Sequence, residues 1–276
     1  MPFIDAHSHV WTPDTEKYPL AAGFKKEGMK PPSWTPEELM AHASAEGVDR
    51  VVLIQMSFYG FDNRYMLDQM KRFPGKFSGV AVIDWTAARP DEDMSKMARE
   101  GVRGFRVRAL SPPYEKWAET PSLERMFRFA ADHDLAICPL LTPEALPSLS
   151  RMCAKHPKTR VVIDHLARVG FGGEVKEPEV DALCKMAQHP EVRVKVSAFY
   201  ALGKGKAPYD DLVPVIRRVH GAFGAKRLMW ATDCPFQVVN GTYRGSIALI
   251  RDGCPWMSKD DKDWLLRRSA ETVFFW

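Results

Sequence analysis

The sequence lacks several features that would place the protein in a membrane or outside the cell. No apolar run approaches the roughly 18 residues that a membrane span needs. The N-terminus has no charged region followed by an apolar stretch, so we expect no signal peptide. Only five cysteines occur, scattered and never as a CxxC pair, which argues against a disulfide framework and a structural zinc knuckle. These absences predict a cytoplasmic protein with no membrane partner.

Clustered positive charge is also lacking. The 39 basic and 35 acidic residues are intermingled, and the net charge is only +4. Because nucleic-acid binders concentrate their basic residues, we expect no nucleic-acid partner. Apolar residues make up 45% of the chain, which excludes intrinsic disorder and is enough for a large core. We expect a small-molecule substrate, and the sequence leaves a homo-oligomer open.

What the chain does contain is a regular alternation of short apolar runs and amphipathic stretches. The runs are rich in Val, Ile, Leu and Phe, as is typical of strands covered on both faces. They cover residues 3–7, 51–56, 77–83, 102–107, 136–141, 160–164, 192–197 and 227–231. Helical spacing follows a capping-box start at 35–38 and recurs at 65–72, 90–100, 122–133, 143–155, 177–189, 209–221, 242–252 and 259–274.

Eight such units predict an α/β fold, a distorted (β/α)8 TIM barrel that forms one domain over residues 1–276. An open doubly wound sheet would usually carry a Gly-rich turn after its first strand, and residues 3–10 have none. Residues 11–34 hold four prolines among Trp and other aromatics, so they cannot be helix or strand throughout. We expect them to form a long loop over the barrel mouth.

Histidine and aspartate stand where such a barrel places its active site, at the C-terminal strand ends. His7 and His9 close the first strand, and residues two apart share a face of an extended segment. His165 follows the sixth strand and Asp233 follows the eighth. All four are ligand types for a divalent cation such as zinc, and we predict them as metal ligands.

These residues carry a resemblance to the amidohydrolase superfamily. Residues 5–11 (DAHSHVW), 101–106 (GVRGFR), 164–166 (DHL) and 228–235 (LMWATDCP) resemble the motifs of the amidohydrolase-related branch. That branch includes sugar-acid lactonases, 2-pyrone-4,6-dicarboxylate lactonase and several metal-dependent decarboxylases. The resemblance covers nearly the whole chain and implies a hydrolase that opens a small carboxylated or sugar-derived lactone.

The fourth and fifth strands depart from the pattern of the superfamily. Many members carry a metal-binding His at the end of the fifth strand and a bridging Lys or Glu at the fourth, whereas this chain has no His at 136–141 and offers Arg106 and Arg108 instead. The resemblance therefore implies at most one cation, with zinc expected. Some lactonases of this branch work without metal, so metal-free catalysis stays open.

The expected catalytic residues are Asp233 and His165. Asp233 would be the general base that activates water, and imidazole or guanidinium groups would stabilise the oxyanion if metal is absent. The alternative for Asp233 is a helix N-cap after the last strand.

Arginines suggest how a carboxylated substrate is held. Arg103, Arg106 and Arg108 alternate on the fourth strand, so we expect them to point to the same side, and Arg168 lies just beyond His165. We predict that Arg106 and Arg108, with Arg168, bind a substrate carboxylate through their planar guanidinium groups. Pairing of one of them with Asp84 or Asp164 is the structural alternative.

Lys195 and a group of aromatic residues complete the expected mouth. Lys195 ends the seventh strand, where it would contact substrate or pair with Asp164. The aromatic residues expected to line an apolar pocket are Trp11, Phe58, Tyr59, Trp85, Phe199, Tyr200 and Phe236.

Two other functions compete with lactone hydrolysis. A metal-dependent decarboxylase of the same superfamily would need a tightly held metal, and its usual fifth-strand His is missing. A barrel that binds a ligand without turnover is disfavoured, because a pure binder has no need for a base beside imidazoles.

Overall fold

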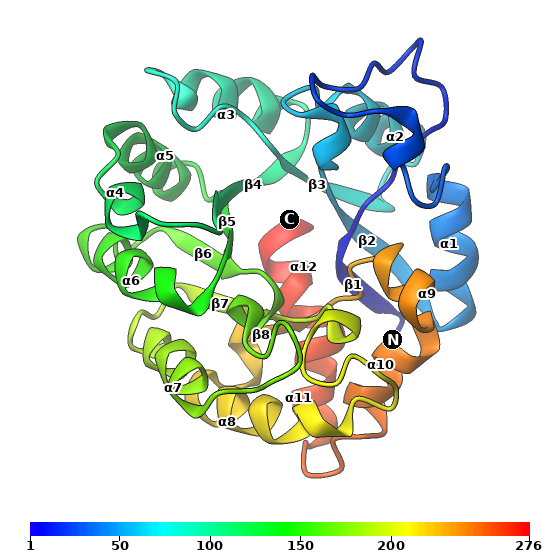
Figure 1. Ribbon diagram of the computed structural model, residues 1–276, viewed down its shortest axis with the longest axis vertical. Coiled ribbons are helices and arrows are strands. Elements are labelled where there is room, and N and C mark those ends of the chain that lie inside the picture. Colours follow the sequence, from blue (N-terminus) through cyan, green and yellow to red (C-terminus); the bar gives the residue numbers. More distant parts are fainter.

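The chain forms a barrel of eight parallel strands in the order β1 to β8, surrounded by helices (Figure 1). The computed structural model describes the backbone of residues 1–276 and every side chain except that of Glu115. The predicted (β/α)8 barrel is confirmed. Its strands are β1 (Phe3–Ser8), β2 (Val48–Ile54), β3 (Phe77–Ala81), β4 (Val102–Ala109), β5 (Ala136–Leu141), β6 (Arg160–Ile163), β7 (Val192–Val196) and β8 (Leu228–Trp230).

The barrel closes between β8 and β1 through the segments that carry the predicted site. The Asp233 amide donates to the His7 carbonyl oxygen at 2.8 Å, and the His9 amide donates to the Cys234 carbonyl oxygen at 2.8 Å. A parallel bridge between Ser8 and Cys234 completes the closure. Residues from opposite ends of the chain thereby meet at one rim.

Helices follow the strands, with boundaries close to those predicted. They are α1 (Pro36–Ala45), α2 (Arg64–Arg72), α3 (Pro90–Arg99), α5 (Pro121–Asp132), α6 (Leu146–Lys155), α7 (Glu177–Lys185), α8 (Val213–Phe223) and α10 (Tyr243–Arg251). The expected capping box at Thr35 is present. The sequence did not predict the short helices α4 (Tyr114–Ala118) and α9 (Phe236–Asn240). Among the helices that the structure describes, none has the length and apolar character of a membrane span.

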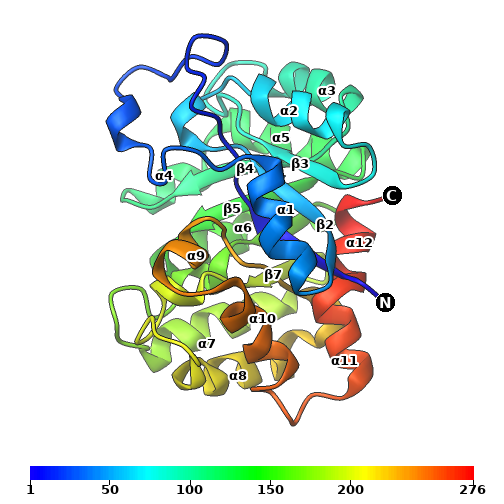
Figure 2. The same cartoon turned by 90° about the vertical axis from the view of Figure 1, so that its right-hand side faces the viewer.

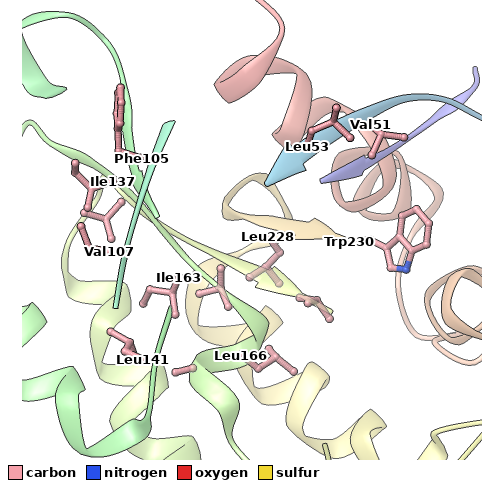
Figure 3. Close-up of a cluster of buried hydrophobic side chains, with 14 of the residues drawn as sticks. Val51, Leu53, Phe105, Val107, Ile137, Leu141, Ile163, Leu166, Leu228 and Trp230 are labelled. Carbon is pink, nitrogen blue, oxygen red and sulfur yellow. The ribbon is translucent and has the colours of Figure 1, made fainter. Parts of the chain in front are cut away.

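Residues of the strands alternate between helices and barrel interior. Figure 3 shows Val51 and Leu53 of β2, Phe105 and Val107 of β4 and Trp230 of β8 within the apolar cluster that packs under the helices. Residues in between, such as Val52 and Ile54, belong to a second cluster inside the barrel. This double burial explains why the strands are continuously apolar in sequence.

The C-terminal segment covers the bottom of the barrel. One helix was predicted at 259–274, whereas the structure has α11 (Lys259–Asp263), a π-helical turn (Trp264–Arg268) and α12 (Ser269–Phe274). Figure 2 shows α12 beside the N-terminus at one end of the molecule. Its Val273 and Phe274 pack into the interior cluster. The floor is thus apolar, and the opposite end is left for polar groups.

Residues 11–34 form a loop anchored at its two ends. Trp11 and Trp34 pair through both backbone amides, at 2.8 and 3.1 Å, and only the short turn Lys26–Gly28 is helical between them. The loop lies beside α2 in Figure 1, where it borders one side of the strand ends.

Candidate active site

A cavity of about 250 Å³ opens at the C-terminal ends of the strands. Its polar lining comes from β4 and from the segments that follow β1, β2, β6, β7 and β8. The polar lining residues include His9, Ser57, Arg106, Arg108, His165, Arg168, Tyr200 and Asp233. This is the end at which (β/α)8 barrels carry their active sites.

Asp233 lies at the centre of the polar lining. Its Oδ1 lies 3.2 Å from His9 Nε2 and 3.4 Å from His7 Nε2. Its Oδ2 accepts a hydrogen bond from the Tyr200 hydroxyl at 2.7 Å and lies 3.9 Å from His165 Nε2. Burial opposes ionisation, but His165, His9 and His7 outweigh it and hold the pKa of Asp233 well below its usual range. The group is therefore a carboxylate at neutral pH.

Two of these residues lie in backbone conformations that L-residues rarely adopt. Asp233 has φ of 66° and His165 has φ of 53°, both in the left-handed region. Arg168 and Ala198, which also line the cavity, share this feature with φ of 61° and 58°. Non-glycine residues in this region cost free energy and cluster at functional sites. The strain thus marks the same rim as the side chains.

The ring of His9 is anchored so that its Nε2 faces the carboxylate. Its Nδ1 lies 2.9 Å from the Ile54 carbonyl oxygen, which accepts only from an N–H. In the neutral ring Nε2 is therefore the acceptor, and it faces Asp233 Oδ1 at 3.2 Å. Two acceptors at this distance repel each other unless a proton or a cation lies between them.

Behind the cavity, Asp164 gathers three groups that are fully or nearly buried. Its Oδ2 accepts from Arg106 Nη2 at 3.0 Å, and its Oδ1 lies 3.0 Å from Lys195 Nζ and 3.3 Å from His7 Nδ1. Burial opposes its ionisation, but Lys195, Arg106 and His7 hold the pKa of Asp164 well below its usual range. Lys195 is fully buried. It therefore takes the alternative that the sequence left open, a pair with Asp164, and lies behind the cavity.

His7 is neutral within this cluster. Arg106 Nη2 lies 2.9 Å from His7 Nε2 and can only donate, so Nε2 accepts and the proton is on Nδ1, facing Asp164. Burial, Lys195 and His165 lower the pKa of His7 well below its usual range. His165 is neutral as well, since burial lowers its pKa to about 4.

The donor set fits a divalent cation. His7, His165 and Asp233 each offer a ligand atom within 4.8 Å of the others. His9 Nε2 adds a fourth donor next to Asp233, and its anchored Nδ1–H is the arrangement that orients metal-binding histidines. The competing group is the Arg106 guanidinium, which engages the Nε2 of His7.

The predicted arginines divide between the two ends of β4. Arg106 is buried, donates to Asp164 and also lines the cavity, so the alternative of an arginine paired with Asp164 holds for this residue. Arg108 is exposed to the cavity and forms no ion pair with any side chain that the structure describes. The interpretation that Arg103 shares their side is wrong: it lies toward the other strand end and stacks on Trp276, 4.5 Å from the ring.

Arg168 completes the basic part of the rim. Its guanidinium stacks on Phe171, 3.7 Å from the ring centroid, and its Nε is buried without a partner among the described residues. Asp84 pairs with none of these arginines; it accepts from Thr86 instead.

Aromatic residues frame the cavity partly as expected. Tyr200 and Phe236 line it, whereas Phe199 is fully buried against Tyr209. The hydrogen bond from Tyr200 to Asp233 was not predicted. It depends on the left-handed Ala198 that turns the chain after β7, and alanine gives no sequence signal for such a turn.

A buried carboxylate under the site was also missed. Asp5 accepts from the amides of His7 at 3.1 Å and Thr232 at 3.0 Å, and from the Tyr243 hydroxyl at 2.9 Å. Burial raises its pKa to about 6 in spite of these donors. Asp5 ties β1 to the segment after β8 and so holds His7 and Asp233 in register.

Comparison with known proteins agrees with this geometry. The family model described as amidohydrolase matches residues 4–276. L-fucono-1,5-lactonase of Burkholderia ambifaria is 30% identical over 252 residues, which cover 87% of this chain and 82% of the relative. 2-pyrone-4,6-dicarboxylate hydrolase of Comamonas testosteroni is 30% identical over 243 residues, or 84% and 76% of the two chains.

Solved structures share the fold. The crystal structure of an amidohydrolase from Burkholderia multivorans with bound zinc aligns with a TM-score of 0.81 at 19% identity and covers 99% of each chain. With the family matched over almost the full length and relatives named as lactonases and hydrolases, the chain belongs to the amidohydrolase family and is a hydrolase.

Proposed function

We propose that this enzyme hydrolyses a small lactone that carries a carboxylate, with Asp233 as the general base. One observation carries the proposal: an ionised carboxylate faces neutral imidazoles in a cavity whose rim holds three guanidinium groups. The names of the relatives support the substrate class, since one acts on a sugar lactone and another on a cyclic dicarboxylate.

The proposed reaction uses groups of this chain for each proton. Asp233 takes a proton from a water molecule as the water oxygen attacks the lactone carbonyl carbon. Arg106 and His165 lie where they can stabilise the resulting oxyanion. The ring C–O bond then breaks, and Asp233 returns the proton to the leaving alkoxide, giving a hydroxy acid.

A single divalent cation, with zinc expected, would be held by His7, His9, His165 and Asp233. When bound, it would lower the pKa of a coordinated water and polarise the carbonyl. His7 and His165 are neutral, and His9 Nε2 faces Asp233 Oδ1 at 3.2 Å, which supports their role as ligands. Metal-free catalysis would rely instead on the positive charge of Arg106.

We propose that Arg108 and Arg168 bind the substrate carboxylate, and that Arg106 assists from the cavity wall. Arg108 has no ion-pair partner among the described side chains, and partial burial and the neighbouring Arg106 lower its pKa, so a bound anion would stabilise its charge. Lys195 and Asp164 would position His7 and Arg106 from behind the cavity.

The test is a panel of lactones, with and without a carboxylate, assayed with metal-analysed protein before and after chelation. Ring opening of carboxylated lactones supports the proposal. Release of carbon dioxide without lactone opening would identify a decarboxylase instead. Tight binding of the panel without turnover would identify a ligand-binding barrel.

We further propose that the enzyme works in the reducing cytoplasm, where its five free cysteines would stay reduced. A homo-oligomer remains a prediction from the sequence.

A further inference from the structure

A second cavity adjoins the candidate active site on the far side of the arginine pair. It measures about 220 Å³ and shares Ser57, Arg106 and Arg108 with the first cavity. No catalytic residue proposed above other than Arg106 contributes to it. It therefore needs an explanation of its own.

The walls of the second cavity are apolar and aromatic. They come from Phe24 in the loop 11–34, Phe61 after β2, and Val82 and Trp85 after β3. Phe24 and Phe61 remain 43% and 60% exposed although phenylalanine is usually buried. Exposed apolar side chains gathered beside a polar site mark a surface that a ligand covers.

The size of this cavity suits a ring. An apolar cavity of about 150 Å³ is enough to hold benzene, and this one is larger. The Arg106 and Arg108 guanidinium groups lie at the boundary of the two cavities and favour a ligand that carries an anionic group. An anion bound to Arg108 would have the cavity of Asp233 on one side and the aromatic cavity on the other.

We infer that the second cavity is a substrate subsite for a planar apolar arm, aryl or conjugated alkenyl, attached near the carboxylate of the lactone. The inference rests on the proposed function and adds a specificity to it. The lactone carbonyl lies in the first cavity, the carboxylate binds Arg108 at the boundary, and the arm stacks between Phe61 and Trp85. Compact lactones that lack such an arm leave the subsite empty and bind more weakly.

The experiment measures binding rather than turnover, by NMR titration of the full chain with acetate and benzoate. The phenyl ring should lower the dissociation constant on the order of tenfold. Trp85→Ala and Phe61→Ala should each remove most of that gain and leave acetate binding unchanged. Arg108→Gln should weaken both probes.

Phe171→Ala is the matched control, because Phe171 is also a phenylalanine that is 60% exposed, yet it lines only the first cavity. It should retain the gain from the phenyl ring. Circular dichroism and thermal melting confirm that each variant is folded before titration.

Equal affinity for the two probes, or a gain that Phe171→Ala removes and Phe61→Ala keeps, would overturn the subsite. Because binding is measured without hydrolysis, the two proposals fail separately. A protein that shows the expected binding pattern but opens no lactone would contradict the proposed function and leave the subsite standing.

Discussion

Contacts with neighbouring residues fix the position of the Asp233 carboxylate. Its backbone is left-handed, its amide is bonded to the His7 carbonyl, and its two oxygens face three imidazoles and one phenol. Each contact restricts the direction in which the carboxylate can accept a proton. Small changes at the contacting residues should therefore alter turnover more than substrate binding.

The Tyr200 hydroxyl tests this restriction. Tyr200→Phe removes the 2.7 Å hydrogen bond to Asp233 and keeps the ring against Phe236. We expect kcat to fall about tenfold with little change in KM, since one hydrogen bond to a charged group is lost. Tyr209→Phe is the control, because its hydroxyl accepts from Gln237 Nε2 and forms no hydrogen bond with the Asp233 carboxylate. Unchanged kcat in Tyr200→Phe would contradict a positioning role.

His165 makes stability depend on pH. Burial lowers its pKa to about 4 in the folded chain, while the unfolded value is near 6.5. The unfolded state binds more protons between these values, so this contribution to stability is present above about pH 6.5 and is lost as the pH falls toward 4. The loss from this group is on the order of 3 kcal/mol.

Urea unfolding of the wild type and His165→Asn at pH 7 and pH 4.5 measures this effect. The free energy of unfolding should fall less between pH 7 and pH 4.5 in His165→Asn than in the wild type. Equal pH dependence in the two proteins would show that His165 is not buried as a neutral ring.

At the scale of elements, β4 separates two kinds of arginine. Arg108 faces the cavity, whereas Arg103 at the other end stacks on Trp276. Arg108→Gln should raise KM for a carboxylated lactone about 10- to 100-fold, because a charge-assisted contact is worth about 1.5–3 kcal/mol. Arg103→Gln should leave KM unchanged. Similar KM values for the two variants would contradict binding of the substrate carboxylate by Arg108.

Strands and long helices were predictable because their apolar period depends on local spacing and double burial. The fifth strand, residues 136–141, matches β5 at both ends. Short elements were missed where they depend on tertiary contacts. The helix α9 after Pro235 has only five residues and follows the strained turn at Asp233, which no local pattern predicts.

The place of several candidate residues at the strand ends was predictable, and the contacts between them were not. The strand-end rule places His9, His165 and Asp233 in one cavity, as expected from the barrel. Lys195 and Arg106 are positioned by ion pairs with the buried Asp164. Because these residues are far apart in the chain, their pairing leaves no periodic pattern in the sequence. Arg103 was misplaced because it lies three positions before Arg106, and an odd offset puts two residues on opposite faces of a strand.

For the molecule as a whole, the apolar floor should carry much of the stability. Phe274 is almost fully buried at the base of the barrel, under Lys195 Nζ at 5.6 Å from its ring. Phe274→Ala should lower the free energy of unfolding by about 3–5 kcal/mol. Trp276→Ala, two residues on and 54% exposed, should cost about 1 kcal/mol or less. Equal losses in urea unfolding would mean that α12 does not close the barrel.

The barrel brings His7 and Asp233 together from opposite ends of the chain, and the account depends on what Asp233 then does. The most direct measurement compares lactone opening by the wild type and Asp233→Asn, with folding checked by circular dichroism. Asparagine keeps the size of the side chain but cannot take a proton, so kcat should fall about 10³-fold or more. A folded Asp233→Asn protein that opens the same lactone at the wild-type rate would contradict the account.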